Sequence, residues 1–457
     1  MMLCLSIALV GCSGTNEQKT AANDTSSNGQ QTESATNTQS ENANPGTTGD
    51  QTVGSDEEFT IRVGSWFLDD RSHEQGLMKA VEEGYKKLYP NAKIQWDITL
   101  GETYVDKLRA QFASDTAPDV IFYQGVDWIK ANNFMDLSNE PWVERLTNEG
   151  KVEPSVFVDG KLWGVPMEAN PNPGVWYNAD MFNELGLTPP TTLQEFMDLC
   201  EKIKEADITP ITIGFKDAWT AEMFYMYWVQ SYGFANDPEF GKKIYDGVLG
   251  FDDPVFHSVF TNFETMKSNG YFNKNALSID WPTSGQMFAA GEAAMIMQGP
   301  WMPGANKDNI ANGGYESFQI GYFPLMDDNG KVGMAMTSGA GLAINAKTKL
   351  VEEAKALVNL FTTQDVIAPW IAGDGALPYL KDIQVSYADP VMDTVQQYIA
   401  DHGALAYNLD IFIPASAKNA LTDIVTKVVS GAKFDPADLK VVSNAFEKDK
   451  ASVTLPY

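Results

Sequence analysis

TIRVGSW, Thr60–Trp66, opens the stretch of this chain that decides its fold. The run is typical of a β-strand, and apolar residues then recur at helical spacing up to Pro90. A second strand is predicted at Lys93–Ile98, a helix at Tyr104–Ser114 and a short apolar strand at Asp119–Tyr123. This β-α-β-α-β order predicts a mostly parallel sheet with right-handed crossover connections, so the fold class is α/β.

The first helix carries a start signal, because Ser72 and Gln75 have the spacing of a capping box. Further along, Gly339–Ile344 is typical of a strand of small residues, and a helical pattern follows it. The intervening region Thr191–Phe288 is expected to be more helical. We find no internal repeat in the sequence.

The N-terminus predicts export and a lipid anchor. Leu9–Cys12 follows a short apolar run and is similar to the lipobox of bacterial lipoprotein signal peptides, although no basic residue precedes the run. A membrane-spanning helix needs roughly 20 residues, so this shorter run fits the apolar part of a signal peptide. We expect residues 1–11 to be a signal peptide and Cys12 to carry the lipid.

Residues 12–58 are predicted to be a disordered tether. Ser13–Glu58 consists mainly of small polar, amide and acidic residues, with no aromatic residue and one branched apolar residue, Val53. Such a segment cannot bury enough apolar surface to offset the entropy lost on ordering. The expected organisation is a lipid anchor, a tether and a folded body.

The composition of the body excludes some classes of function. The formal net charge of −29 and the pI near 4.4 argue against nucleic acid as a partner, since its recognition needs clustered Lys and Arg. No stretch of the body is apolar and long enough to predict a transmembrane helix. Cys4 would leave with the signal peptide and Cys12 would carry the lipid, so Cys200 would have no cysteine partner, and its helical surroundings predict a buried core residue.

The motifs of common enzyme classes are absent from the sequence. The three histidines are His73, His257 and His402, and none has a partner at metal-ligand spacing. There is no G-x-S-x-G elbow, no P-loop and no complete dinucleotide loop, so we expect no metal and no cofactor. A glycosidase needs only two carboxylates, so an exported carbohydrate-active enzyme stays open as an alternative.

Several motifs resemble, in order, those of the extracellular solute-binding proteins of family 1. They are Ala117–Phe122, Gly160–Pro166, Trp176–Asn178 with Phe182, Leu185–Leu187 with Pro189, Thr192, Glu195 and Phe196, Phe288 with Gly291–Met295, Gly299–Trp301, and Gly339–Ala346 with Ala354, Leu357 and Phe361. The matches extend over most of Phe59–Tyr457. Members of this family supply the ligand-capture subunit of ABC importers, mostly for sugars, and Gram-positive members are usually tethered lipoproteins.

The resemblance implies a two-lobe, periplasmic-binding-protein-like fold similar to that of maltose-binding protein. Residues 59–168 plus 332–376 would form the N-terminal lobe, and residues 169–331 plus 377–457 the C-terminal lobe. The ligand would lie in the cleft between the lobes, which close by hinge motion. The protein would be a monomer without catalytic activity, anchored to the outer face of the cytoplasmic membrane of a Gram-positive cell, and its partners would be the ABC permease subunits.

A neutral sugar offers hydroxyl groups and apolar C–H faces, so its site needs aromatic platforms together with carboxylates or amides. Residues of these types stand after the first and third strands, at the predicted crossings and in loops of the second lobe. The candidate ligand-binding residues are Trp66, Asp69, Gln124, Asp127, Glu168, Asn170, Trp219, Trp301 and Asp374.

The arginines favour a neutral ligand. The chain has Arg62, Arg71, Arg109 and Arg145, all in its first part, and only Arg71 lies in a candidate binding loop. Phosphate and carboxylate ligands are usually held by a bidentate arginine, which the second lobe lacks. The leading hypothesis is a sugar-binding lipoprotein of an ABC importer, and a structural surface protein is disfavoured by the strand and helix order.

Overall fold

A computed structural model describes residues 58–101, 103–171, 173–405 and 407–455. The predicted signal peptide, Cys12 and the predicted tether up to residue 57 lie outside these ranges. Within the ranges, none of the helices is long and apolar enough to cross a membrane.

The first lobe is built on a sheet with strand order β2-β1-β3-β13-β6. Its strands are β1 (Thr60–Ser65), β2 (Lys93–Ile98), β3 (Val120–Tyr123), β6 (Val165–Pro166) and β13 (Gly341–Ile344). β1 pairs in parallel with β2 and β3, as the sequence predicts, and β13 runs antiparallel to β3 and β6. The sheet therefore takes β13, which lies between β3 and β6, from a part of the chain far from the other strands.

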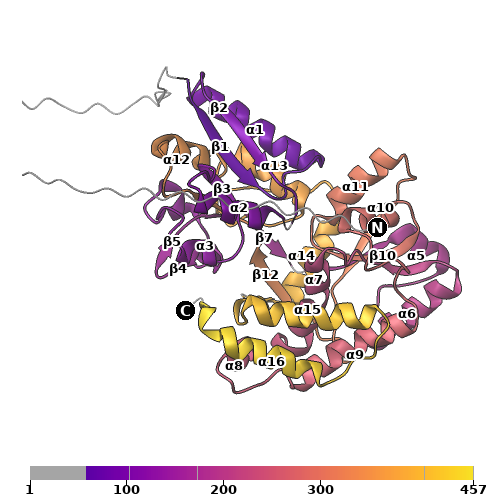
Figure 1. Cartoon of the computed structure of the whole chain (residues 1–457). Coiled ribbons are helices and arrows are strands. Elements are labelled where there is room, and N and C mark those ends of the chain that lie inside the picture. The colour runs from indigo at the N-terminus through magenta and orange to yellow at the C-terminus, as the bar shows by residue number, and fades with distance from the viewer. Residues whose placement is uncertain (1–57, 102, 172, 406, 456–457) are drawn as a thin grey trace, which may run out of the picture. The chain divides into compact units, whose positions relative to one another are not determined.

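Helices pack on this sheet through apolar faces. They are α1 (Ser72–Leu88), α2 (Thr103–Ala113), α12 (Val351–Leu360) and α13 (Gln364–Asp374). α1 buries Leu77, Val81 and Tyr85, which recur every four residues and so share one side of the helix. Figure 1 shows α1 beside β1 and β2.

The predicted helix start is right in position but wrong in mechanism. Arg71 is the N-cap of α1 and makes no side-chain cap hydrogen bond. The hydroxyl of Ser72 donates instead to Asp308 at 3.1 Å, and the amide of Gln75 donates to the backbone carbonyl of Asp69 at 2.5 Å. A capping box needs the serine one position earlier, outside the helix, so the prediction of a capping box is wrong.

The second lobe has a sheet with strand order β11-β8-β10-β9. Its strands are β8 (Gly174–Asn178), β9 (Thr209–Thr212), β10 (Ala293–Gln298) and β11 (Ile320–Phe323). The helices around it are α5 (Ala179–Leu185), α6 (Leu193–Glu205), α7 (Ala218–Val229), α8 (Phe240–Tyr245), α9 (Pro254–Ser268), α10 (Trp281–Ala289), α11 (Met302–Gly313), α14 (Val391–His402), α15 (Ala415–Val429) and α16 (Asp438–Asp449).

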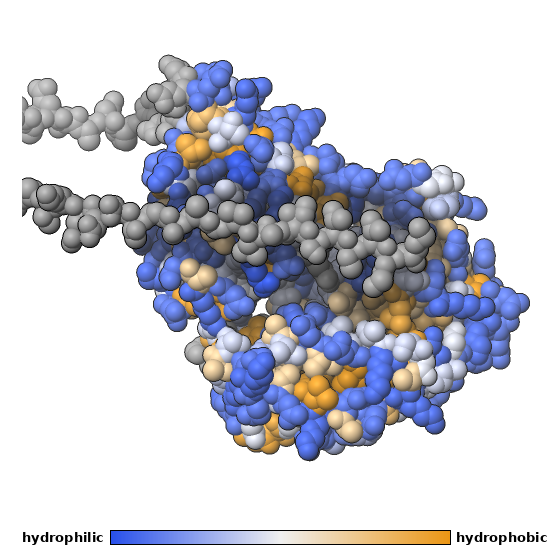
Figure 2. Space-filling view, viewed as in Figure 1, coloured by the Kyte–Doolittle hydropathy of each residue, from blue (hydrophilic) through white to orange (hydrophobic). Residues whose placement is uncertain are grey.

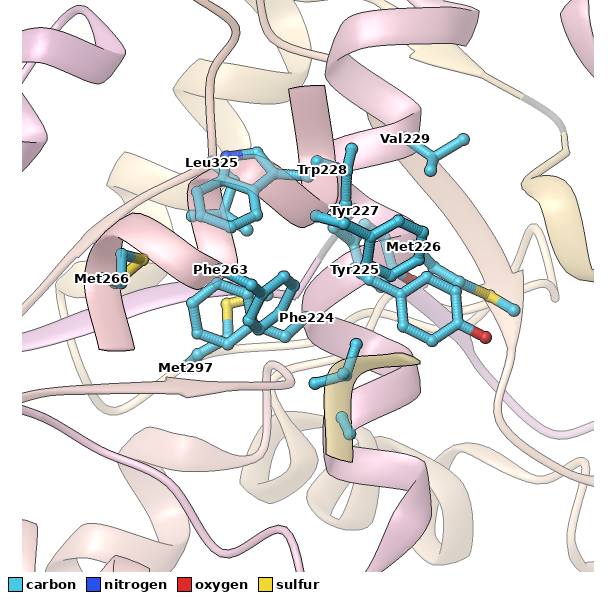
Figure 3. Close-up of a cluster of buried hydrophobic side chains, with 14 of the residues drawn as sticks. Phe224, Tyr225, Met226, Tyr227, Trp228, Val229, Phe263, Met266, Met297 and Leu325 are labelled. Atoms are coloured by element: carbon cyan, nitrogen blue, oxygen red, sulfur yellow. The ribbon is translucent and has the colours of Figure 1, made fainter. Parts of the chain in front are cut away.

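The core of the second lobe is rich in aromatic side chains. Figure 3 shows consecutive residues of α7, among them Phe224 and Trp228, close to Phe263 of α9. The ring centroids of Phe224 and Phe263 lie 5.0 Å apart, and Trp228 meets Phe263 edge to face at 5.3 Å. Cys200 is fully buried in the same core, and burial raises the pKa of its thiol, so it is the inert core residue that the sequence predicts.

Three crossing segments connect the lobes and lie side by side. The strand β7 (Ala169–Pro171) pairs antiparallel with β12 (Met334–Ser338), which also pairs with β14 (Ala404–Leu405). The backbone of Ala169 exchanges hydrogen bonds with Leu377 of the third segment. Figure 1 shows β7 and β12 between the helices and strands of the two lobes.

Each lobe has its own hydrophobic core. Ala169 packs in the first core and Val175 in the second, close to the predicted first crossing. Ala335 still belongs to the second core, and the first core continues to Ile383. Val332 and Met334 likewise pack in the second core, and Ala376 and Tyr379 in the first.

The remaining elements are short. They are β4 (Phe157–Val158), β5 (Lys161–Leu162), α3 (Asp127–Lys130), α4 (Asn148–Lys151), the 3-10 segments Pro141–Arg145, Leu409–Ile411 and Lys450–Ser452, and a π-helical turn at Gln230–Phe234. Figure 2 shows a face that is mostly hydrophilic, with separate small hydrophobic areas.

Candidate functional site

Glu168 and Asn170 are buried polar side chains at the first crossing, where β7 pairs with β12. Glu168 Oε1 accepts a hydrogen bond from Asn170 Nδ2 at 3.2 Å. Glu168 Oε2 and Asn170 Oδ1 are buried and have no hydrogen-bond partner among the described residues. Buried polar atoms without a partner are rare, so two of them together mark a place where a bound molecule can supply the missing hydrogen bonds.

The surroundings of Glu168 favour its uncharged form. Burial raises the pKa of Glu168 well above its usual range, and the nearby carboxylates of Asp374 and Glu74 raise that pKa further. Hydrogen bonds from the backbone N–H of Gly339 and from Asn170 act in the opposite direction. A Cβ atom at Gly339 would lie only 2.5 Å from Glu168 Oε1, so this close approach of the backbone requires glycine.

Of the two candidate residues that follow the third strand, one joins the group around Glu168 and the other does not. Gln124 Nε2 donates a hydrogen bond to the carbonyl oxygen of Gly339 at 2.5 Å, so Gln124 joins the group around Glu168. Asp127 is exposed at the start of α3, and its carboxylate makes no hydrogen bond or ion pair within the described part of the chain. Asp127 therefore stands apart from the other candidates.

Ionised side chains gather at the N-terminus of α1. Arg71 Nε lies 2.8 Å from Asp69 Oδ1 and 2.9 Å from Asp69 Oδ2, and Arg71 Nη2 lies 3.0 Å from Glu74 Oε1. His73 Nε2 lies 3.4 Å from Glu74 Oε1 and 3.6 Å from Asp374 Oδ1, at the end of α13. Asp69 and Asp374, predicted from separate loops, thus meet in one cluster.

Arg71 is fully engaged inside this cluster. Besides the two carboxylates, its guanidinium donates to the carbonyl oxygen of Phe67 at 3.3 Å. Burial opposes the charge of Arg71, but Glu74, Asp69 and Asp374 outweigh it and raise its pKa. A guanidinium held in this way is not available for a bidentate hydrogen bond to an anionic ligand.

Trp66 stands at the edge of the same region. It is half-buried at the end of β1, 5.1 Å from the ring of Phe67 and 5.8 Å from that of Tyr104. Phe67 contacts Trp370, whose indole N–H donates to Glu74 Oε2 at 3.0 Å. Trp66 is therefore connected to the acidic cluster through two aromatic rings.

The second lobe contributes three half-buried tryptophans. The ring of Trp219 lies 6.2 Å from that of Trp281 and 6.0 Å from that of Trp301, both edge to face. Trp219 follows β9 and Trp301 follows β10, and these strands are parallel, so both rings come from the same edge of the sheet. Ligands of open α/β sheets bind at the carboxyl ends of the strands, which is where these rings lie.

A backbone hydrogen bond at the start of α10 positions Trp281 in this aromatic group. The backbone N–H of Trp281, at the first position of α10, donates to Asp217 Oδ2 at 2.9 Å, and Asp217 is the N-cap of α7. Trp219 is the second residue of α7, so its predicted position in a loop is wrong. The guanidinium carbon of Arg71 lies 6.0 Å from the ring centroid of Trp281, which is a cation–π contact between the lobes.

The lobes also touch through polar and backbone groups. The N–H of Ser72 donates to Asp308 Oδ2 at 2.8 Å, and α11 carries this aspartate. A Cβ atom at Gly304 would lie 2.4 Å from the carbonyl oxygen of Gly373, so the two backbones are in direct contact. The acidic cluster of the first lobe and the tryptophan group of the second therefore face one junction.

The sequence missed several members of this region. The structure brings Glu168, Asn170, Gln124, Asp69, Asp374, Trp219 and Trp301 to the junction of the lobes. It adds Arg71 as a structural ion-pair partner, together with Glu74, His73, Trp281, Gly339 and Asp308. A usable signal existed for Trp281, because Asp280-Trp281-Pro282 is a helix start with aspartate as N-cap and proline in the first turn.

The junction combines polar groups of the first lobe with aromatic rings of the second. The polar groups are the unpartnered oxygens of Asn170, which accepts, and of Glu168, which accepts when ionised and donates when protonated. Such a combination suits a ligand that has hydroxyl donors on its edges and apolar faces. The guanidinium of Arg71 at the same junction is already bound by the carboxylates of Asp69 and Glu74.

Comparisons with known proteins agree with this architecture. A family model described as bacterial extracellular solute-binding protein matches residues 70–368. The multiple sugar-binding protein of Streptococcus mutans is 26% identical over 345 residues, which cover 73% of this chain and 79% of that protein. An uncharacterized ABC transporter extracellular-binding protein of Pyrococcus horikoshii is 23% identical over 390 residues, with 82% and 85% covered.

Solved structures show the same fold. The solute-binding protein RafE in complex with raffinose superimposes with a TM-score of 0.69 at 22% identity, covering 86% of this chain and 100% of that one. A chitin oligosaccharide binding protein gives a TM-score of 0.72 at 21% identity, with 86% and 99% covered. The family model spans well over half of the sequence, and the two-lobe architecture agrees with it. This chain belongs to the bacterial extracellular solute-binding protein family.

Proposed function

We propose that this protein captures a neutral sugar or oligosaccharide for an ABC importer and binds it at the junction of the two lobes. The three tryptophans supply flat faces for the C–H sides of sugar rings, and Glu168 and Asn170 supply acceptors for hydroxyl groups. Relatives and structural neighbours are named for sugar, raffinose and chitin-oligosaccharide binding, which supports this ligand class.

Arg71 is the main reason for choosing a neutral ligand, because carboxylates of the protein already bind its guanidinium. Anionic ligands usually need a bidentate guanidinium, and this one is held by Asp69 and Glu74. The burial of Glu168 beside other carboxylates disfavours an additional negative charge at the same place. Trp66, Asp69, Gln124, Asp127 and Asp374 remain candidates for ligand contact from the first lobe.

Delivery requires the permease to distinguish the ligand-bound form. The ligand must therefore bind the closed arrangement of the lobes more tightly than the open one, since equal affinities would shift no population. In this proposal the protein has no catalytic activity, acts as a monomer and meets the permease subunits through its closed form.

The membrane attachment is a separate part of the proposal. It rests on the lipobox-like Leu9–Cys12 and on the polar composition of residues 13–58. A diacylglyceryl group on Cys12 would hold the folded body at the outer face of the cytoplasmic membrane of a Gram-positive cell.

The proposal is tested by titrating the purified protein with neutral mono- and oligosaccharides, anionic sugars and amino acids while following its melting temperature. A ligand that binds the native state raises the melting temperature in a saturable way. We expect such a rise with at least one neutral sugar. A rise with anionic ligands alone contradicts the choice of ligand, and turnover of a glycan supports the alternative of a carbohydrate-active enzyme.

Asp308→Ala tests the polar contact between the lobes. The Asp308 carboxylate accepts hydrogen bonds from the N–H and the hydroxyl of Ser72, at a helix start that has no cap of its own. Loss of a cap costs about 1 kcal/mol, and each 1.4 kcal/mol corresponds to a tenfold change in affinity, so we expect the sugar Kd to rise by roughly fivefold. Calorimetric titration measures the change.

The matched control is Asp198→Ala, which removes an exposed aspartate from α6 of the same lobe that bonds only its neighbour Gln194. The control is expected to keep the wild-type Kd. Equal affinities for Asp308→Ala and the control would show that this contact does not stabilise the closed arrangement.

A further inference from the structure

His73, Glu74 and Asp374 place three metal-ligating side chains together at the junction of α1 and α13. One nitrogen or oxygen atom from each side chain lies within 4.8 Å of the other two. All three side chains are buried, and the side chain of His73 is only 5% exposed. His73 and Asp374 are far apart in the sequence, so no spacing rule could have paired them.

The imidazole of His73 is unusual for a buried side chain. Neither Nδ1 nor Nε2 has a hydrogen-bond partner among the described residues. The two carboxylate oxygens beside Nε2 lie at 3.4 Å and 3.6 Å, beyond the usual hydrogen-bond distance. A histidine buried in this way calls for an additional partner.

The two separations fit the edges of a metal-coordination polyhedron. Tetrahedral zinc with bonds of about 2.0–2.1 Å places neighbouring ligand atoms roughly 3.3 Å apart. The distances from Nε2 to the oxygens of Glu74 and Asp374 are close to this value. One imidazole and two carboxylates, with water at the fourth position, are a ligand set that zinc accepts.

The charges around the cluster favour a divalent cation. Asp69, Glu74 and Asp374 supply three carboxylates, and Arg71 is the guanidinium that faces them. The helix dipoles oppose each other here, because the cluster meets the start of α1 and the end of α13. Two negative charges thus remain when the imidazole is neutral, and Zn²⁺ would balance them.

Most neighbours of the cluster can keep their own contacts when a metal is bound. Arg71 retains both oxygens of Asp69, and Trp370 bonds the second oxygen of Glu74, whereas Arg71 Nη2 would share Glu74 Oε1 with the metal. A pocket of about 360 Å³ lies on one side of the imidazole and is lined by His73, Ser72 and Gly373. Glu74 and Asp374 do not line it, so the ligand atoms themselves lie beyond its wall.

We propose that His73, Glu74 and Asp374 bind one Zn²⁺ ion that ties α1 to α13 at the lobe junction. This site does not depend on the sugar proposal, since none of its contacts needs a ligand between the lobes. Its position suits a structural role, because the ring of His73 lies 3.8 Å from the place of a Cβ atom on Gly304 of the other lobe.

The test uses the whole protein, treated with a chelator and then titrated with Zn²⁺ alone, in the absence of sugar. Calorimetry is expected to show one ion per chain, and the melting temperature is expected to rise by several degrees with saturation. His73→Gln is expected to lose this binding. The control His402→Gln removes an exposed histidine that stacks on Tyr398, and it is expected to bind Zn²⁺ as the wild type does.

Asp374→Asn provides a second variant if His73→Gln folds poorly, and it is expected to weaken Zn²⁺ binding at least tenfold. The competing state of the cluster is an imidazolium held by the two carboxylates. The zinc proposal is overturned in favour of the imidazolium if the wild type binds no stoichiometric Zn²⁺. It is also overturned if both variants bind the ion as tightly as the wild type.

Discussion

Trp219→Ala is expected to weaken sugar binding by roughly 30-fold. Truncating a central aromatic residue of a binding site typically costs ~2 kcal/mol of binding free energy, which corresponds to that factor. Trp219 is the middle ring of the tryptophan group, with Trp281 and Trp301 on its two sides. Removing it takes away one platform and also the edge contacts that hold the other two rings in place. Calorimetric titration with the sugar identified by the ligand panel measures the loss.

The control for this substitution is Trp96→Ala in the first lobe. Trp96 is likewise half-buried, but it lies on β2, where its indole N–H donates to Glu82. We expect Trp96→Ala to lower the melting temperature slightly and to leave the sugar Kd unchanged. An unchanged Kd for Trp219→Ala, in a variant that melts as the control does, would remove the tryptophan group from the binding site.

Glu168→Gln is expected to stabilise the ligand-free protein while it weakens sugar binding. In the wild type the unpartnered oxygen of Glu168 lies in a buried place, and burial raises the pKa of this carboxyl well above its ordinary value of 4.5. Glutamine has the same shape and no charge to bury. We expect the free energy of unfolding to rise by about 1.4 kcal/mol for each pH unit above the unfolded-state pKa over which the folded carboxyl must stay protonated, which glutamine avoids.

The pH dependence of this gain has a definite sign. A carboxyl whose pKa is higher in the folded than in the unfolded protein binds more protons when folded, so stability falls as the pH rises above the unfolded-state value. Glutamine does not titrate. The stabilisation by Glu168→Gln should therefore be near zero at about pH 4 and should grow toward neutral pH. Thermal unfolding at several pH values, in buffer with a chelator, measures it.

Sugar binding by this variant should fall about tenfold or more, as expected for the loss of a hydrogen bond to an ionisable group. Glu168 Oε1 already accepts from Asn170 and from the N–H of Gly339, so the amide oxygen must stay there. The amide NH₂ keeps the donor that the protonated carboxyl has on its other oxygen, and it removes the acceptor that the ionised carboxyl offers to a ligand hydroxyl. A variant that binds sugar as the wild type does would show that a ligand hydroxyl does not donate to this oxygen.

Local patterns predicted the first half of the first lobe well. Thr60–Trp66, Lys93–Ile98 and Asp119–Tyr123 agree with β1, β2 and β3 to within a residue, because the first two alternate apolar and polar residues and the third is a short apolar run. The capping-box prediction was wrong because the group that caps α1 is distant in the sequence. The cap of α1 comes from Asp308 of the other lobe, so the serine was free to enter the helix.

The candidate site was predictable where a residue follows a strand or lies in a crossing segment. Glu168, Asn170, Trp219 and Trp301 occupy such positions, and the topology brings them to one junction. His73, Glu74 and Trp281 stand within or at the start of helices, where a polar or aromatic residue is ordinary. Only the packing of α13 against α1 and of α10 beside the start of α7 reveals their partners.

The discontinuous first sheet has a consequence for synthesis on the ribosome. β13 fits between β3 and β6, but the whole of the sheet of the second lobe precedes it in the chain. The first lobe therefore cannot close its sheet until most of the protein has been made. Pairing of such distant segments is slow, because loop-closure entropy must be overcome before the contacts form. The nascent chain thus stays incompletely folded for longer than a chain of two successive domains would.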